Sequence, residues 1–207
     1  MRPLLWCVLG FVAFPIVMCV AALIYMNMAA SGFSARAHPM ALEKLAAMQA
    51  RLMAMPSGAK TKQNSVPNTQ EVIAEGREHW ADHCATCHAN DGSGQTEMGK
   101  NMYPPAPDMR KRDTQSMTDG ELFYVIENGV RLSGMPAWGA GSREDQESSW
   151  KLVRFIRHLP NISPEEITEM EKLNPKTPDE LEEEQQEEQF LKGQPSNPST
   201  SMKKHHH

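Results

Sequence analysis

Cysteine is scarce in this chain, and its scarcity limits which metal or cofactor sites the chain can form. Of the four cysteines, only Cys84 and Cys87 lie outside the apolar N-terminal run. A structural zinc site needs four ligands and usually a second close cysteine pair, so zinc is a poor interpretation. Positive charge is not in excess either: the formal net charge is −5, which implies no general affinity for nucleic acid. No stretch alternates apolar and polar residues as a half-buried strand does, so the sequence predicts an all-α protein.

Charge is absent from most of the N-terminal end. Residues 3–26 carry no charged side chain. At ~1.5 Å per residue, a helix of that length spans a hydrocarbon core of ~30 Å. The alternative is a cleaved signal peptide, whose apolar core is usually only ~7–15 residues long. We therefore predict that residues 1–28 form an uncleaved transmembrane anchor. Basic residues flank the run on both sides, so charge leaves its orientation open.

A helical connector is predicted next. Residues 39–55 consist mostly of good helix formers, and their apolar side chains recur at three- and four-residue steps: Leu42, Leu45, Met48, Leu52 and Met55. This stripe could pack on the following domain, on another subunit or on the membrane surface. Thioethers bind soft copper, but methionine also fills irregular contacts, and we favour that interpretation. Residues 56–70 are rich in turn formers and predict an exposed linker, so the connector region covers 29–69.

The residues that indicate a functional site are the motif Cys84-Ala85-Thr86-Cys87-His88. A Cys-x-x-Cys pair is compatible with a redox dithiol, half of a zinc site or covalent haem attachment. A thioredoxin-like dithiol needs a βαβ setting, which the sequence does not indicate. The adjacent histidine favours haem attachment, in which two thiols add to the porphyrin vinyl groups and His88 reaches the iron from one face. Such a short motif also arises by chance, so its surroundings must support it.

Three predicted helices surround this motif. The first is capped near Thr69 and runs into the motif. The second covers 116–129 and begins with a capping box, and the third covers 145–160. Together they predict a small helical domain over residues 70–160. A domain of ~90 residues buries only about two-thirds of its unfolded-chain surface, and a covalently held haem would supply the missing apolar volume.

These residues resemble class I cytochrome c, a monohaem c-type cytochrome. The resemblance covers about 70–160, less than half of the chain. Gly76 and Trp80 are similar to the family's small residue and aromatic on the first helix, where it crosses the last helix against Trp150 or Phe155. The Gly- and Pro-rich residues after the motif are similar to the family's loop. The resemblance therefore implies the class I cytochrome c fold, with three core helices around a covalent haem.

The resemblance also implies a set of haem-binding residues. Cys84 and Cys87 would hold one haem c covalently, and His88 and Met135 would be the axial ligands of its iron. The carbonyl of Pro107 would accept the hydrogen bond of the His88 ring N–H, which fixes the tautomer and raises the ligand's basicity. No catalytic residue and no small-molecule substrate are implied.

The expected function follows from this ligation. A His/Met-bound iron has no open coordination position, and methionine raises its reduction potential. We expect a membrane-tethered cytochrome that carries single electrons between partner proteins of a respiratory chain, or the cytochrome subunit of such a complex. The resemblance implies a single-pass protein of the bacterial cytoplasmic membrane with its haem domain facing the periplasm. If Met135 is labile, the alternative is a haem enzyme or ligand sensor.

The C-terminal end is acidic, with eleven carboxylates between residues 165 and 188. We predict a tail over 161–207 that is helical after Ser163 and Thr177 and then disordered. Its acids either keep the chain soluble or dock a basic redox partner.

Histidines raise a third, weaker possibility, metal handling. The terminal Lys203–His207 run, or the helix pair His79 and His83, could bind copper, nickel or zinc. The plainer alternatives are a purification remnant for the run and ordinary surface or haem-edge histidines for the pair.

Overall fold

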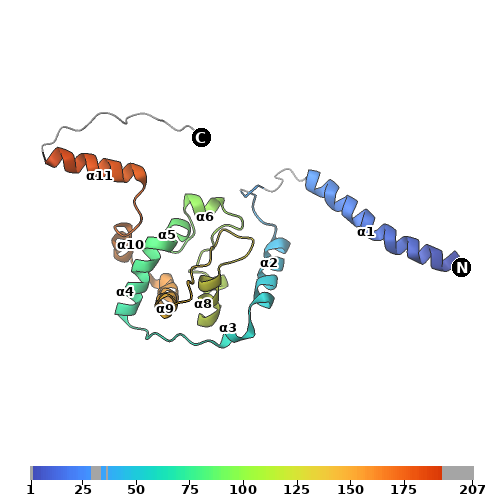
Figure 1. The fold of residues 1–207 in the computed structure, drawn as a ribbon, viewed down its shortest axis with the longest axis horizontal. Coiled ribbons are helices and arrows are strands. Elements are labelled where there is room, and N and C mark those ends of the chain that lie inside the picture. Colours follow the sequence, from blue (N-terminus) through green and yellow to red (C-terminus); the bar gives the residue numbers. More distant parts are fainter. Residues whose placement is uncertain (1, 29–33, 36, 193–207) are drawn as a thin grey trace.

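The fold is made of helices joined by loops. The computed structural model describes residues 2–28, 34–35 and 37–192, and this part of the chain has no strand (Figure 1), which confirms the all-α prediction. In chain order the elements are α1 (Arg2–Met28), α2 (Ala41–Ala54), α3 (Ser57–Thr61), α4 (Gln70–His79), the π-helical turn η1 (Trp80–Cys84), α5 (Ala85–His88), α6 (Glu97–Asn101), α7 (Arg112–Gln115), α8 (Asp119–Asn128), α9 (Arg143–His158), the 3₁₀ turn η2 (Leu159–Asn161), α10 (Pro164–Glu171) and α11 (Pro178–Leu191).

Helix α1 extends away from the rest of the chain (Figure 1). Its segment Gly10–Asn27 has a mean hydropathy of 2.0, and none of that segment is buried inside the protein. By length and composition α1 is therefore a possible membrane anchor. Pro15 lies within the helix without ending it, as lipid-embedded helices tolerate.

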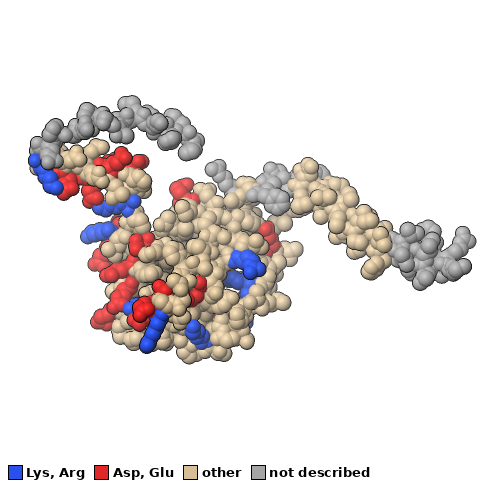
Figure 2. Space-filling view, in the orientation of Figure 1, with Lys and Arg blue, Asp and Glu red and all other residues tan. Residues whose placement is uncertain are grey.

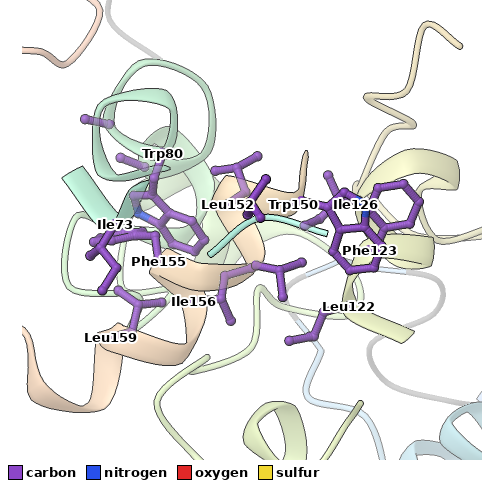
Figure 3. Close-up of a cluster of buried hydrophobic side chains, with 14 of the residues drawn as sticks. Ile73, Trp80, Leu122, Phe123, Ile126, Trp150, Leu152, Phe155, Ile156 and Leu159 are labelled. Atoms are coloured by element: carbon purple, nitrogen blue, oxygen red, sulfur yellow. The ribbon is translucent and has the colours of Figure 1, made fainter. Parts of the chain in front are cut away.

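The core is organised by the crossing of α4 and α9. A Cβ atom on Gly76 would lie 2.3 Å from the Lys151 carbonyl oxygen, so only a glycine allows the two backbones to come this close. One turn later, the rings of Trp80 and Phe155 pack with centroids 5.6 Å apart. Of the two aromatics expected at this crossing, the structure therefore selects Phe155, as Figure 3 shows.

Helix α8 completes the core on the other side of α9. The rings of Phe123 and Trp150 stack with centroids 4.1 Å apart, and Figure 3 shows this pair separated from the Trp80 group by aliphatic side chains. The predicted capping box is present: Glu121 N–H donates to the Thr118 hydroxyl, and the Glu121 carboxylate accepts from Thr118 N–H. The cap sets where α8 begins, and hence which of its residues face the core.

The segment before α4 differs in part from the expected exposed linker. Met55, Ala59 and Val66 are all buried. The guanidinium of Arg154 donates to the Val66 carbonyl at 2.7 Å, and the Asn64 amide donates to the Trp150 carbonyl at 3.2 Å. Most of residues 56–70 are exposed, as predicted for a linker, but the segment is also held to α9. Arg154 binds its backbone at Val66, and its Asn64 side chain binds the backbone of α9, contacts that turn-forming residues do not reveal.

The beginning of the predicted tail also belongs to the core. The caps at Ser163 and Thr177 are formed as predicted, but α10 is docked, since Met170 is completely buried. Arg77 of α4 and His158 of α9 both contact the Glu166 carboxylate, at 3.2 and 3.0 Å. The exposed acidic helix is α11, which has no buried residue. Figure 2 shows acidic side chains gathered over the side where α4, α10 and α11 lie.

The close approach at Gly76 predicts a stability effect. Replacing a helical glycine by alanine usually stabilises a helix by about 0.5–1 kcal/mol, but here the new methyl group overlaps a backbone oxygen. We expect Gly76→Ala to destabilise the domain by about 1–3 kcal/mol, as overpacking does, which lowers the melting temperature by about 4–8 °C per kcal/mol. Gly58→Ala is the matched control, because a Cβ at Gly58 meets nothing within 4 Å. Equal melting temperatures for the two variants would contradict this account of the crossing.

Candidate functional site

The Cys-x-x-Cys-His motif lies at the end of one continuous helical run. Helix α4 passes into the π turn η1, and η1 passes into α5, which ends at His88. A π turn carries one more residue than an α turn, so it rotates every following side chain about the helix axis. Single π turns inside α-helices are frequent at functional sites. Here the turn ends at Cys84 and thereby sets the direction of the motif's three functional side chains.

Both cysteines of the motif are free thiols. Cys84 packs against the hydrophobic core and is half-buried, as is Cys87. Burial, with a smaller contribution from Cys87, raises the pKa of the Cys84 thiol to about 12, and burial also raises the pKa of Cys87. Both groups are therefore protonated thiols at neutral pH.

His88 is buried and neutral. Burial lowers the pKa of its imidazole to about 4, so the ring is uncharged at pH 7, the form in which histidine binds metals. The ring lies 5.6 Å from that of Trp80, whose indole N–H donates to the Ala89 carbonyl. The ring nitrogen Nδ1 of His88 is buried without a hydrogen-bond partner in the described part of the chain, a costly state that calls for an explanation.

Pro107 lies in a loop that folds back towards the motif. Gly94 N–H donates to the His88 carbonyl at 2.8 Å, and the Pro107 carbonyl oxygen lies beside Gly94, 3.2 Å from where a Cβ would stand. The predicted bond between Pro107 and His88 Nδ1 is nevertheless not formed in this structure. It stays a prediction for the haem-loaded protein, in which the spare nitrogen requires an acceptor.

An arginine that the sequence analysis missed holds this loop together. Arg110 pairs with Asp91, just after the motif, at 2.8 Å, and with Asp108, next to Pro107, at 2.9 Å. The Arg110 guanidinium lowers the pKa of the Asp108 carboxyl to about 2. The pair is therefore charged at any physiological pH. The short spacing of Asp108 and Arg110 was a possible sequence signal, but Asp91 has no visible link to them in sequence.

Met135 is presented by a loop that returns to the end of α8. Val130 N–H donates to the Met135 carbonyl at 3.1 Å, and Trp138 N–H donates to the Ile126 carbonyl at 3.1 Å. The φ of Gly129 is 66°, and a Cβ there would overlap the Met135 carbonyl at 2.7 Å. The loop is thus closed on itself, and the Met135 side chain is half-buried at its centre.

The Met135 loop reaches the haem-motif helix through Trp138. The indole meets the His83 ring edge-on, with centroids 5.4 Å apart at 88°, and His83 directly precedes Cys84. His83 also stacks on His79 at 4.8 Å. The two rings thus form a stacked pair, and within the described residues no group of three or more His, Cys, Asp or Glu side chains could hold a metal ion. The terminal histidines lie outside the described residues.

The other methionines that could take the place of Met135 as an iron ligand differ in how far they are buried. Met109 and Met117 pack against the core, Met170 is completely buried, and Met98 is exposed. Met102 is different, because a Cβ on Gly134 would lie 2.1 Å from its sulfur. The structure thus brings Met102 against the Met135 loop.

The comparison with known families agrees with this geometry. Residues 71–156 match the family model described as cytochrome c oxidase, cbb3-type, subunit III. These residues form a c-type cytochrome domain. No curated protein matches the chain closely enough to count as a relative. The matched cytochrome domain contains α5, α8 and the Met135 loop, and it leaves α1, α2, α10 and α11 outside.

The residues of the cytochrome domain fit haem c. A free thiol pair stands one helical turn from a neutral histidine whose Nδ1 lacks a partner, and a methionine loop contacts the same helix. Cys84 and Cys87 would hold the group, His88 and Met135 would ligate its iron, and Pro107 lies in the loop that returns to the motif.

Covalent attachment yields a first prediction for this site. If Cys84 and Cys87 form thioether bonds to haem, acidic acetone will not extract the haem from the polypeptide, because these bonds survive loss of axial ligation. Replacing both cysteines by alanine should leave little folded domain, since the small core loses its central apolar group. The measurements are haem absorbance in the extracted polypeptide and helical circular dichroism. Haem that washes out of the unaltered protein would refute the attachment.

The contact between Trp138 and His83 yields a second prediction. An aromatic pair contributes about 0.5–1.5 kcal/mol beyond its buried area, so Trp138→Ala should favour opening of the Met135 loop about 2- to 10-fold. Trp138→Phe keeps an aromatic contact and should behave like the unaltered protein. The measurement is cyanide affinity of the ferric protein, because cyanide would have to displace Met135 if this residue is the sixth ligand. A similar affinity in Trp138→Ala and Trp138→Phe would show that the contact does not hold the loop.

Proposed function

We propose that this protein is a membrane-tethered monohaem cytochrome c that carries single electrons between partners of a respiratory chain. The observation that carries the proposal is the meeting of two elements distant in sequence. The motif helix, with Cys84, Cys87 and neutral His88, is contacted through Trp138 by the loop that presents Met135. The elements that carry His88 and Met135 thus meet through Trp138 and His83, within the residues that match the family model, which supports the proposal.

Each residue has a defined part in this proposal. Bound haem c supplies a one-electron couple, whose potential a methionine ligand raises. His88 offers a neutral nitrogen without first losing a proton. The loop closed between Val130 and Trp138 holds Met135 in place, so that with haem bound His88 and Met135 would both ligate the iron. A fully ligated iron leaves no position for a substrate, which supports electron transfer over catalysis.

The membrane topology is part of the same proposal. α1 is the single-pass anchor, and the cytochrome domain faces the bacterial periplasm. The family model describes a subunit of an oxidase, so we propose that the partners belong to a membrane-bound electron-transport complex. Gentle detergent extraction of the native membrane tests this. Co-purification of an oxidase supports a subunit, and isolation as a single chain supports a mobile carrier.

The identity of the sixth ligand tests the proposal most directly. Met135→Ala should lower the reduction potential, abolish the absorption band of methionine bound to ferric iron, and allow cyanide or carbon monoxide to bind. Met102→Ala is the matched control, because its sulfur lies against Gly134, next to Met135, and its removal should change none of these properties. The measurements are redox titration and visible spectra of both oxidation states.

Two results would overturn the assignment. If Met135→Ala keeps the band and Met102→Ala removes it, Met102 is the ligand. If the unaltered protein lacks the band and binds carbon monoxide avidly, the electron-carrier proposal gives way to a haem enzyme or ligand sensor.

The acidic helix α11 allows a separate test of partner docking. No residue of α11 is buried, so deletion of residues 178–207 should leave the core intact. If its carboxylates attract a basic partner, the deletion should slow electron transfer at low ionic strength and flatten the salt dependence. Stopped-flow transfer rates across a salt series provide the measurement. Unchanged rates would leave α11 with a solubilising role only.

A further inference from the structure

Helix α2 has two sides, and only one of them is covered by the domain. On the covered side, Lys44 pairs with Asp113 at 3.3 Å, Glu43 accepts a hydrogen bond from the Tyr103 hydroxyl, and Met55, directly after the helix, is buried. These contacts place α2 against the loops that follow the haem motif. Of the predicted apolar stripe, Met55 is buried and Met48 and Leu52 are half-buried, whereas Leu42 and Leu45 are exposed.

The other side of α2 carries large apolar side chains that face solvent. Leu42, Leu45 and Met53 are 75, 50 and 83% exposed. At ~100° per residue they fall within about 80° of one another around the helix. Ala46 lies at the edge of this sector, and Gln49 is the polar residue within it. An apolar stripe on a helix that is already docked through its other faces requires a second apolar environment.

The position of α2 indicates what that environment is. Residues 29–40 are all that separates it from α1, and the Tyr25 hydroxyl at the end of α1 contacts the Met40 sulfur just before α2, at 4.0 Å. Tyrosine is enriched at the membrane–water boundary. In Figure 1, α2 runs across the direction of α1, on the side of the domain from which α1 departs. If α1 crosses a membrane, a helix that runs across the direction of α1 at its end lies along the surface of that membrane.

We infer that α2 lies in the lipid interface, with Leu42, Leu45 and Met53 inserted among the acyl chains. This inference rests on the proposed anchoring by α1. Amphipathic helices bind at the boundary of headgroups and acyl chains in this way. Glu43 and Lys44, on other faces of α2, contact Tyr103 and Asp113, so the helix holds the cytochrome domain on the membrane surface with the loop after the haem motif beside the bilayer.

Photo-crosslinking in phosphatidylcholine vesicles tests the inference with the full-length, haem-loaded chain. A benzophenone amino acid replaces Leu42 or Met53, and the matched control places it at Ala47, which is exposed on α2 and lies about 140° around the helix from Leu42. A further chain carries it at Phe14 of α1, as a positive control for lipid contact. After irradiation, mass spectrometry identifies the peptide that gained a phospholipid, and flotation reports membrane association.

The expected result is lipid adducts at 14, 42 and 53 and none at 47. If the chain floats and forms adducts at 14 but not at 42 or 53, the inference is overturned while the anchor stands. Crosslinks between two chains at 42 or 53 would identify a self-association surface and also overturn it. Failure to float would overturn both the anchor and the inference. An unchanged haem spectrum in each variant confirms that the domain is folded.

Discussion

The contact between the backbones of α4 and α9 at Gly76 sets the geometry on which the site depends. Because no side chain separates the helices there, Trp80 reaches Phe155 one turn later and fills the space beside His88. The π turn begins at this same tryptophan. The crossing therefore fixes the helix just before it changes from α to π winding. Because α4 is fixed there, the rotation that the π turn introduces gives Cys84, Cys87 and His88 one defined orientation. A looser crossing would let the motif turn about its own axis.

Around the motif the buried side chains are uncharged, and the charged side chains lie nearer the surface. His88 and the two thiols are shielded enough to stay uncharged, and the ion pairs that hold neighbouring loops lie further out. Arg110 joins Asp91 to Asp108 at the edge of the motif loop, and Arg77 joins α4 to α10. An uncharged interior costs less to desolvate and accepts a large apolar cofactor. Partly exposed ion pairs contribute less stability, but they order loops that have few apolar side chains of their own.

The sequence predicted local structure better than it predicted contacts. The helix caps at Thr69, Thr118, Ser163 and Thr177 follow from residue types within one turn, and all four are present. The all-α class follows from periodicity in the same way, and the cytochrome domain was predicted from the resemblance of its motifs to a known family. What could not be predicted depends on partners far along the chain. Val66 and Met170 look like linker and tail residues, and only the surfaces of α9 and α4 make them part of the core. The contact of Trp138 with His83 and that of Met102 with Gly134 likewise join segments with no shared local pattern. For the haem ligands themselves, sequence motif and structure lead to the same proposal.

The packed connector bears on the choice between a mobile carrier and a subunit. A flexible chain of residues 37–69 would reach up to ~110 Å at ~3.3 Å per residue, enough for the domain to search for distant partners. Folded, α2 spans only ~21 Å at ~1.5 Å per residue, and the segment after it is bound to the domain through Ala59, Asn64 and Val66. The domain therefore cannot swing on this segment without breaking core contacts. If α1 and α2 fix the domain at the membrane as proposed, its haem would stay near one height above the bilayer and would reach only partners at that height. This constraint favours a place within a membrane complex over long-range shuttling.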